Sequence, residues 1–391
     1  MKLSKLTLKH FRNYADLSLP CSPQLNILLG KNGQGKTNLL EAVYFLSHTK
    51  SNRTGSDREL LQHGQPQALL MAEILPAHFE GLLTLTAQLS LADETSRLKT
   101  SFKINGTPAR SRSAVLGYIP SVGFFLSDLL LLRGTPENRR QWLDAATTQY
   151  DKRHLAYASE YHRIRQQKSR LLKNDPQTIS AAHLDTWNDQ LARAGAQLMA
   201  SRMQYISMAE HPAMARYAEL SATQETLSLA YKSDSVTDTD GPIDVPQLTA
   251  LLQTQLIQRQ PEEIRRGTCL VGPHRDDVVF CLNDRDAATY GSQGQQRSIV
   301  LALKLTELSL LQTRLGEAPV LLLDDVMAEL DPDRQAYLMA NLPPEAQVFL
   351  TTTHLDHTLA PLLTRTDTDI RIMEISAGEI SDRKILSEAS V

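Results

Sequence analysis

The sequence predicts an α/β protein with a parallel sheet, an antiparallel sheet and an inserted helical domain. Residues 24–44, QLNILLGKNGQGKTNLLEAVY, give a strand, a glycine-rich loop and a helix without a gap. Residues 320–323 form a second apolar run, which ends in two carboxylates. Helical periodicity begins near residue 144 and continues for more than sixty residues. Parallel strands are buried on both faces, so apolar runs bounded by functional side chains favour this class.

A chain of 391 residues is long enough for two or three domains. We expect one domain to consist of residues 1–126 plus 268–391, where the strand-like segments and both motifs lie. Residues 127–267 are expected to form a helical domain inserted between its two halves. This insert includes an acidic, turn-rich loop at 233–244.

The glycine-rich loop fits the pattern G-x-x-x-x-G-K-[ST]. In this pattern the backbone N–H groups and the helix N-terminus bind phosphates, the lysine reaches the β- and γ-phosphates, and the hydroxyl binds Mg²⁺. Lys36 and Thr37 have these last two roles, which predicts ATP and Mg²⁺ as cofactors. The other expected nucleotide-binding positions are Gly30, Lys31, Asn32, Gly33, Gln34 and Gly35.

The two carboxylates after the second apolar run are Asp324 and Asp325. At the tip of a central strand, Asp324 is expected to complete the Mg²⁺ site that Thr37 begins. Asp325 is then expected to be catalytic, orienting or deprotonating a water that attacks the γ-phosphate.

Alternating hydrophobicity predicts an antiparallel sheet near the N-terminus. Residues 3–11 and the run around Leu17 and Leu19 indicate a hairpin that leads into the phosphate-loop strand. Further alternating runs lie near 68–75 and 82–91. They are followed by a hairpin with the turn Asn105-Gly106.

The insert is predicted to contain an αα-hairpin, broken at Asn174-Asp175-Pro176. Apolar residues recur at intervals of three and four in both halves, which is typical of a short coiled-coil seam. A further helix is expected at about 246–258. The β-like segment VVFCLND is then expected to return the chain to the sheet.

The overall charge gives no indication of a nucleic-acid partner, because 41 basic and 44 acidic residues leave a net −3. Residues 133–173, in contrast, contain ten Lys or Arg and four acids. Such a local excess fits phosphate neutralisation, although a solvated helix face would look similar. Arg163, Arg165 and Lys168 are the candidate DNA contacts.

Scattered cysteines and the lack of a long apolar run predict a soluble, cytoplasmic protein.

A third motif, Ser292-Gln293-Gly294-Gln295-Gln296-Arg297, precedes a long amphipathic helix. It resembles the signature S-G-G-Q of ATP-binding-cassette proteins, although Gln293 replaces a glycine. In that family the signature of one subunit covers ATP bound to the phosphate loop of another. The resemblance implies that Ser292, Gly294 and Gln295 contact nucleotide across a homodimer interface.

Two shorter segments resemble other parts of these ATPases. Glu329-Leu330-Asp331 resembles the D-loop. His354, after the apolar run Val348-Phe349-Leu350, resembles the switch histidine that senses the γ-phosphate. No glutamine stands in FFLSDLLLLRG, where related proteins have a Q-loop. Whether Ser127 or Asp128 replaces it stays open.

Together the motifs resemble the RecF recombination mediators, relatives of the SMC ATPase heads. The matching segments are FRNY at 11–14, GKNGQGKTNLLEAVYFLS at 30–47, PENRRQWLD at 136–144, GPHRDD at 272–277, YGSQGQQRS at 290–298 and LLLDDVMAELD at 321–331. The resemblance implies an ABC-type ATPase head with a helical lid, and it places Arg12 in the nucleotide site. It also implies an ATP-dependent homodimer that binds single-stranded DNA, duplex DNA and junctions, helps load recombinase and has RecR- and RecO-type partners.

Other functions use the same motifs. A transporter's nucleotide-binding subunit is disfavoured by the helical insert and the missing Q-loop. A nuclease fused to an SMC-like head would need another acidic cluster. ATP as a structural clamp without turnover remains a third alternative.

Asp325 stands where most related heads have glutamate, and its side chain is shorter by about 1.5 Å. We therefore expect slow, DNA-stimulated hydrolysis.

Overall fold

The computed structural model describes residues 1–76, 81–91, 98–174, 180–221, 225–236, 244–355 and 369–383. The chain divides into two compact units. The first unit consists of Met1–Asp128 and Lys304–Val391, and the second unit is Leu129–Leu303. Within the described residues, no helix has the length and apolar character needed to cross a membrane.

The first unit contains a six-stranded sheet that is parallel except at one edge. Its spatial order is β15 (Glu379–Arg383), β14 (Ile370–Ser376), β3 (Leu25–Leu29), β13 (Val348–Thr352), β12 (Val320–Asp324) and β8 (Ser121–Phe124). β3 and β12 are buried along their whole length, as their apolar sequences predict. The predicted parallel core is therefore confirmed.

A second sheet in this unit is antiparallel throughout. Its order is β2 (Tyr14–Pro20), β1 (Lys2–Phe11), β4 (Gln67–Leu75), β5 (Leu83–Leu91), β6 (Leu98–Ile104) and β7 (Thr107–Pro108). Asn105 and Gly106 connect β6 to β7 with φ of 49° and 77°. Two positive φ angles are typical of a type I′ hairpin turn, so this predicted hairpin is confirmed.

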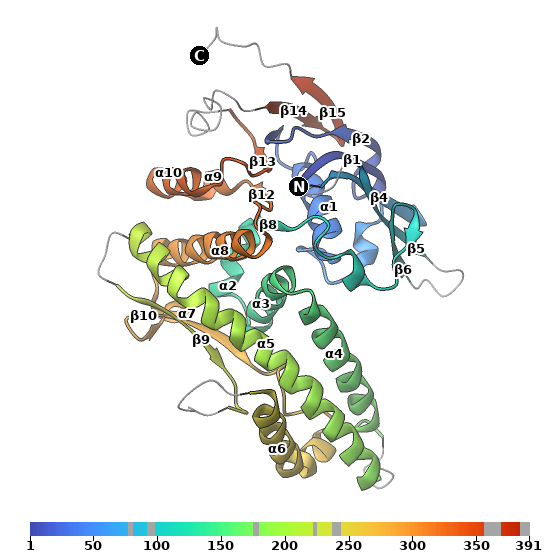
Figure 1. Ribbon diagram of the computed structural model, residues 1–391, viewed down its shortest axis with the longest axis vertical. Coiled ribbons are helices and arrows are strands. Elements are labelled where there is room, and N and C mark those ends of the chain that lie inside the picture. The colour runs from blue at the N-terminus through green and yellow to red at the C-terminus, as the bar shows by residue number, and fades with distance from the viewer. Residues whose placement is uncertain are drawn as a thin grey trace. The chain divides into compact units, whose positions relative to one another are not determined.

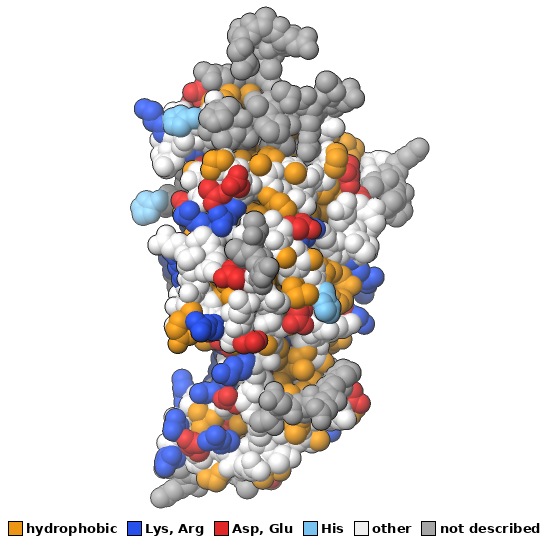
Figure 2. Space-filling view, turned by 90° about the vertical axis from the view of Figure 1, so that its left-hand side faces the viewer, with side chains coloured by type: hydrophobic (Ala, Val, Ile, Leu, Met, Phe, Trp, Pro, Cys, Tyr) orange, Lys and Arg blue, Asp and Glu red, His pale blue; other side chains and the backbone are white. Residues whose placement is uncertain are grey.

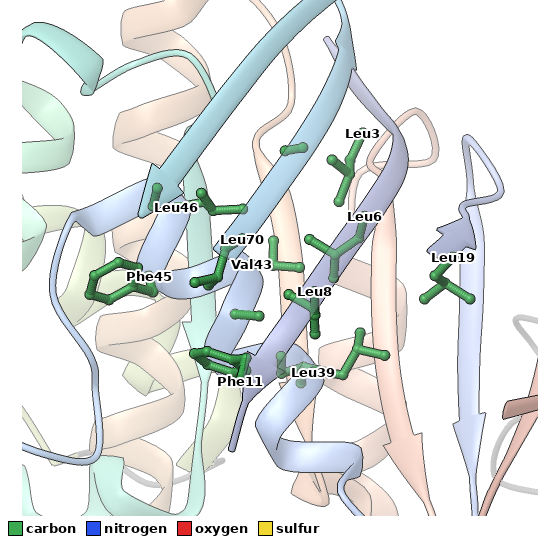
Figure 3. Close-up of a cluster of buried hydrophobic side chains, with 14 of the residues drawn as sticks. Leu3, Leu6, Leu8, Phe11, Leu19, Leu39, Val43, Phe45, Leu46 and Leu70 are labelled. Carbon is green, nitrogen blue, oxygen red and sulfur yellow. The ribbon is translucent and has the colours of Figure 1, made fainter. Parts of the chain in front are cut away.

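Helix α1 (Lys36–His48) packs between the two sheets. Figure 3 shows Leu39 and Val43 of α1 close to Leu6 and Leu8 of β1. These side chains belong to one core cluster with residues of the parallel sheet, including Phe349. Because α1 begins in the phosphate loop, its burial fixes that loop against both sheets.

The first unit has further short helices. They are the 3₁₀ turns η1 (Asp57–Leu60) and η2 (Arg112–Val115), with α9 (Val326–Glu329) and α10 (Pro332–Asn341). Two elements cross the division between the units, η3 (Leu126–Leu129) and α8 (Gln293–Leu315).

The second unit is largely helical (Figure 1). Its helices are α2 (Leu130–Arg133), α3 (Pro136–Tyr150), α4 (Arg153–Leu171), α5 (Ala181–Ser221), α6 (Val245–Arg266) and α7 (Ala287–Tyr290). A three-stranded antiparallel sheet accompanies them, in the order β11 (Arg285–Asp286), β10 (Asp277–Leu282) and β9 (Leu227–Lys232). Apolar side chains of α4, α5 and α6 form one core cluster.

The αα-hairpin is present as α4 and α5, but its first helix begins at Arg153 instead of near 144. Residues 144–150 belong to α3, which ends before Asp151. The Asp151 carboxylate accepts a hydrogen bond from the backbone N–H of Arg153, the first residue of α4. Residues 175–179 and 237–243, in the expected break and acidic loop, lie outside the described residues.

The expectation that VVFCLND rejoins the main sheet is wrong. This segment forms β10, which pairs with β9 and β11 inside the second unit. β9 was not predicted, although larger apolar residues (Leu227, Leu229 and Tyr231) alternate with small or polar ones along its six residues. Pairing with β9 also groups residues 268–303 with the helical unit, whereas we expected a boundary at 267.

Candidate nucleotide-binding site

The phosphate loop and the acidic strand tip meet at the carboxyl edge of the parallel sheet. β3 and β12 both pair with β13, so they lie about 9.6 Å apart, or two strand spacings. The Thr37 hydroxyl spans this gap and donates to Asp324 Oδ1 at 2.9 Å. Thr351, at the end of β13, donates to the same oxygen at 2.9 Å. Three adjacent elements thus converge on one carboxylate.

Side chains from the FRNY segment hold the phosphate loop in shape. Asn13 Nδ2 donates to the carbonyl of Gln34 at 3.0 Å, and the Tyr14 hydroxyl donates to the carbonyl of Gly35 at 2.9 Å. On the other side, the backbone N–H of Gly378 donates to the Gln34 carbonyl at 3.1 Å. The loop is therefore fixed from both ends of the chain.

The Lys36 ammonium lies across the loop. Its Nζ donates to the carbonyls of Gly30 at 2.6 Å and Lys31 at 3.1 Å, and the residue is 3% exposed. Carbonyl oxygens orient the ammonium without neutralising it. A buried ammonium that forms no ion pair with any described residue attracts an anion such as phosphate.

The two aspartates differ in their surroundings. Burial raises the pKa of the Asp324 carboxyl, while hydrogen bonds from Thr351 and Thr37 oppose the rise. Asp325 has a left-handed backbone with φ of 49°, a conformation that costs a non-glycine residue about 1–2 kcal/mol. Its N–H donates to Thr351 Oγ1 at 2.8 Å. Thr351 therefore positions both aspartates.

Arg12 is bound to α1 through a bidentate pair with Glu41, at 3.0 and 2.7 Å. Glu41 is fully buried and also contacts Arg53, at 3.3 Å. Arg53 donates to Asn38 Oδ1 at 2.7 Å. The cluster places two guanidinium groups beside the first turn of α1, and Glu41 offsets part of their charge.

His354 is exposed, two residues beyond the end of β13. Its backbone carbonyl accepts a hydrogen bond from the Thr352 hydroxyl at 2.8 Å. The carbonyl of Thr352 in turn accepts from the N–H of Gly30 at 3.2 Å.

In the segment resembling the D-loop, the Asp331 carboxylate caps α10 by accepting a hydrogen bond from the backbone N–H of Arg334.

The signature residues belong to the second unit and cap α8. Ser292 Oγ accepts from Gln295 N at 3.2 Å, while Gln295 Oε1 accepts from Ser292 N at 2.7 Å. This reciprocal pair is a capping box. Gln295 also donates to Glu225 at 2.7 Å. Gln293 and Gly294 form the start of the helix.

The three candidate DNA contacts on α4 have different environments. Arg163 is exposed and contacts Glu160 at 3.5 Å, and Arg165 is half-buried. Lys168 is wholly buried in an ion pair with Glu263. The expectation that Lys168 contacts DNA is therefore corrected, because its ammonium does not reach the surface.

Asp128, one of the two candidates for the missing glutamine, is half-buried. Its Oδ2 accepts from Phe125 N at 2.8 Å. Burial raises the pKa of this carboxyl to about 6, although the positive charge of Lys304 lowers it.

Several residues of this site were missed from the sequence. Thr351 was not singled out from the sequence, yet it contacts both aspartates. Asn13 and Tyr14 were noted only as part of the segment FRNY, which resembles the family, and no structural role was predicted for them. The signal for Thr351 lies in strand pairing, since it is the register partner of Asp324.

We expect Gly35→Ala to distort the phosphate loop. Gly35 has φ of 116°, and an added Cβ would lie 2.5 Å from Asn13 Nδ2. The change therefore adds a collision to a backbone strain of about 1–2 kcal/mol. Gly64→Ala is the matched control, because Gly64 has φ of 79° and open space around it. Thermal unfolding should show the larger loss for Gly35→Ala, and equal losses would contradict the close contact.

Comparisons with known proteins show the family and the fold. Residues 2–372 match the family described as RecF/RecN/SMC N terminal domain. A "DNA replication and repair protein RecF" of Symbiobacterium thermophilum is 38% identical over 380 residues, which cover 97% of this chain and 98% of that protein. The protein of the same name from a Synechocystis species is 39% identical and covers 98% of both chains.

Solved structures give the same result. The structure described as the recombination mediator protein RecF-ATP in the RecFOR pathway has a TM-score of 0.86 at 27% identity, and covers 98% of both chains. The Smc head domain derived from Pyrococcus furiosus has a TM-score of 0.52 at 15% identity, covering 98% of this chain and 96% of that one, and shares the fold alone. The predicted ABC-type α/β head is confirmed, and the chain belongs to the RecF family of DNA replication and repair proteins.

Proposed function

We propose that this chain is an ATP-dependent DNA-binding protein of recombinational repair, which forms a dimer on ATP and hydrolyses it slowly. The observation that carries the proposal is the convergence of Thr37, Asp324 and Thr351 beside the Lys36 ammonium. A phosphate loop with an adjacent carboxylate at the strand tip is the arrangement that nucleoside triphosphates require.

ATP binds at the N-terminus of α1 in this proposal. Backbone N–H groups from Gly30 to Thr37 contact the phosphates, and Lys36 reaches the β- and γ-phosphates. Thr37 and Asp324 present a hydroxyl and a carboxylate 2.9 Å apart, a pair of oxygen ligands that suits Mg²⁺. The ion would neutralise charge on the phosphates. Arg12 adds positive charge at the same end of the helix.

Asp325 is the proposed catalytic base, and His354 the proposed γ-phosphate sensor. Asp325 N–H is held by Thr351, which fixes the backbone but leaves a short side chain to reach the attacking water. A misplacement of about 1 Å reduces rates on the order of a hundredfold. Hydrolysis well below one per second then serves as a timer for release from DNA.

The signature residues complete the site of a second copy. A serine and a helix start present N–H groups and a positive dipole to an anion. In this structure the N–H groups of Ser292 and Gln295 are used in the capping box at the start of α8, so binding of the partner's ATP would exchange these hydrogen bonds for contacts with phosphate. ATP would therefore be bound between two protomers, and its hydrolysis would separate them.

DNA is the proposed partner of the second unit. Figure 2 shows Lys and Arg side chains gathered at the lower end of one face, where α5 and α6 lie in Figure 1, with acidic side chains among them. Arg163 and Arg165 of α4 are further basic residues of this unit. The proposed DNA ligands are single strands, duplexes and their junctions, and RecR- and RecO-type proteins are the proposed partners in loading recombinase.

Size-exclusion chromatography with light scattering tests the shared site. We expect Ser292→Arg to bind ATP in each monomer but to remain monomeric, because a long cation would fill the space of the partner's nucleotide. Asp325→Asn should bind ATP and dimerise, yet hydrolyse at least about a hundredfold more slowly. ATP affinity equal to that of the parent protein is the folding control for both.

Each possible outcome tests a different part of the proposal. Dimerisation of Ser292→Arg with ATP would contradict the shared site. Parental hydrolysis by Asp325→Asn would remove the assignment of the base. Parent protein that binds ATP and dimerises without any turnover, with or without DNA, would support the structural clamp instead.

A further inference from the structure

Three arginines of the second unit lie around His274 without a matching set of carboxylates. They come from different elements: Arg140 from α3, Arg165 from α4 and Arg275 from the loop before β10. The positive charge of each acts on His274. Arg275 is exposed, while Arg140 and Arg165 are half-buried.

The acidic residues nearby have other partners. Asp144 forms a bidentate pair with Arg202, at 2.7 and 2.9 Å. Asp277 forms a bidentate pair with Arg139, with both contacts at 2.7 Å. The described residues provide no carboxylate within ion-pairing distance of Arg165 or Arg275.

The third acidic neighbour, Asp276, faces the interior and is 2% exposed. It accepts hydrogen bonds from the hydroxyls of Tyr231 at 2.5 Å and Ser233 at 2.7 Å. The backbone of Arg165 lies beside this loop, because its carbonyl accepts from Cys269 Sγ at 3.9 Å. With no described carboxylate paired to Arg165 or Arg275, the two guanidinium groups are suited to bind an external anion.

The imidazole of His274 is uncharged and lies among the three arginines. Burial and the three arginines lower its pKa to about 4. In the neutral ring, Nε2–H donates to the Cys269 carbonyl at 3.2 Å, and Nδ1 accepts from the Tyr161 hydroxyl at 2.5 Å. The hydroxyl reaches the ring because Gly272 has no side chain, since a Cβ there would lie 2.4 Å from it.

The loop that bears Arg275 is held firmly. Arg140 donates to the carbonyl of Asp276 at 2.6 Å, and Arg202 donates to the carbonyl of Pro273 at 2.7 Å. Arg275 N donates to the carbonyl of Gly272 at 3.0 Å, which closes a tight turn. The exposed guanidinium of Arg275 is consequently presented from a fixed backbone.

We propose that Arg165 and Arg275, supported by Arg140, bind backbone phosphates of DNA at this surface. The proposal rests on the DNA-binding function proposed above and assigns residues to it. Guanidinium groups bind phosphate with two parallel hydrogen bonds, which favours them over lysine. Phosphate contacts carry no sequence information, so this surface binds DNA irrespective of sequence.

Fluorescence anisotropy of a fluorescein-labelled duplex, titrated with ATP present over a range of KCl concentrations, tests the proposal. Arg275→Gln should lower affinity at least about tenfold and reduce the log–log salt slope by about 0.9. Arg165→Gln combined with Arg275→Gln should reduce the slope by about 1.8. The losses should be equal on a second duplex of shuffled sequence.

Arg110→Gln is the control, because Arg110 is an exposed arginine of the first unit, outside the proposed DNA surface. It removes the same charge and should leave affinity and slope unchanged. Parental DNA affinity and slope in both Arg275 variants would overturn the assignment while leaving DNA binding intact. A fall in ATP affinity or melting temperature with Arg275→Gln would also overturn it. Failure of the parent protein to bind DNA would instead reject the proposed function, and this surface with it.

Discussion

Lys36→Ala is expected to abolish ATP binding at millimolar nucleotide. The substitution removes an ammonium that is 3% exposed and already oriented by the carbonyls of Gly30 and Lys31. Each charge-assisted hydrogen bond contributes about 1.5–3 kcal/mol, so losing two corresponds to a loss of affinity of at least about a hundredfold. The two carbonyls also lose their donor, which weakens the loop that must surround the phosphates.

Isothermal titration calorimetry with ATP measures this effect. Lys50→Ala is the control, because Lys50 is an exposed lysine just after α1, and its removal should leave ATP affinity unchanged. ATP-dependent dimerisation should disappear together with binding in Lys36→Ala. Parental affinity in this variant would show that nucleotide does not bind at the phosphate loop.

Lys168→Met should destabilise the second unit by about 3–5 kcal/mol. Lys168 and Glu263 form an ion pair in which both side chains are 0% exposed. Glu263 also accepts from Leu270 N at 2.7 Å, a single hydrogen bond that does not offset a buried negative charge. Removing the lysine alone therefore leaves a carboxylate in the core of the helical unit.

Urea unfolding followed by tryptophan fluorescence measures this loss, because Trp142 and Trp187 are the chain's two tryptophans and both belong to the second unit. Combining Lys168→Met with Glu263→Gln should restore most of the stability, since no buried charge remains. Arg170→Met, at an exposed position of the same helix, should change stability by less than about 0.5 kcal/mol. An unchanged unfolding midpoint in Lys168→Met would contradict the buried pair.

The Lys168 result illustrates the limit of charge counting. The sequence shows ten basic residues between 133 and 173, but it does not show which are neutralised. Glu263 lies 95 residues from Lys168 in the chain, and only the packing of α4 against the other helices brings them together. Arg275 is the opposite case. From the sequence it was noted only as part of the segment GPHRDD, and only the folded chain shows that it is exposed and has no described carboxylate partner.

The sequence by itself determined the parallel sheet and the meeting of Thr37 and Asp324 at its carboxyl edge. The apolar runs at β3 and β12 suffice to bury two strands, and the chemistry of the phosphate loop is local to eight residues, 30–37. The carboxyl ends of parallel strands lie at one edge of a sheet. The sequence alone therefore predicts that Thr37 and Asp324 lie close together. Local backbone preferences also determined the hairpin at Asn105-Gly106.

The tertiary structure alone decided which strands pair and which charges are compensated. β10 was expected in the main sheet but pairs with β9, because an edge strand from the insert was available. Thr351 became part of the site through its register with Asp324. Pairing and register depend on contacts between residues far apart in the chain, whereas periodicity and turn chemistry depend only on neighbours, which is why the sequence predicted the latter and not the former.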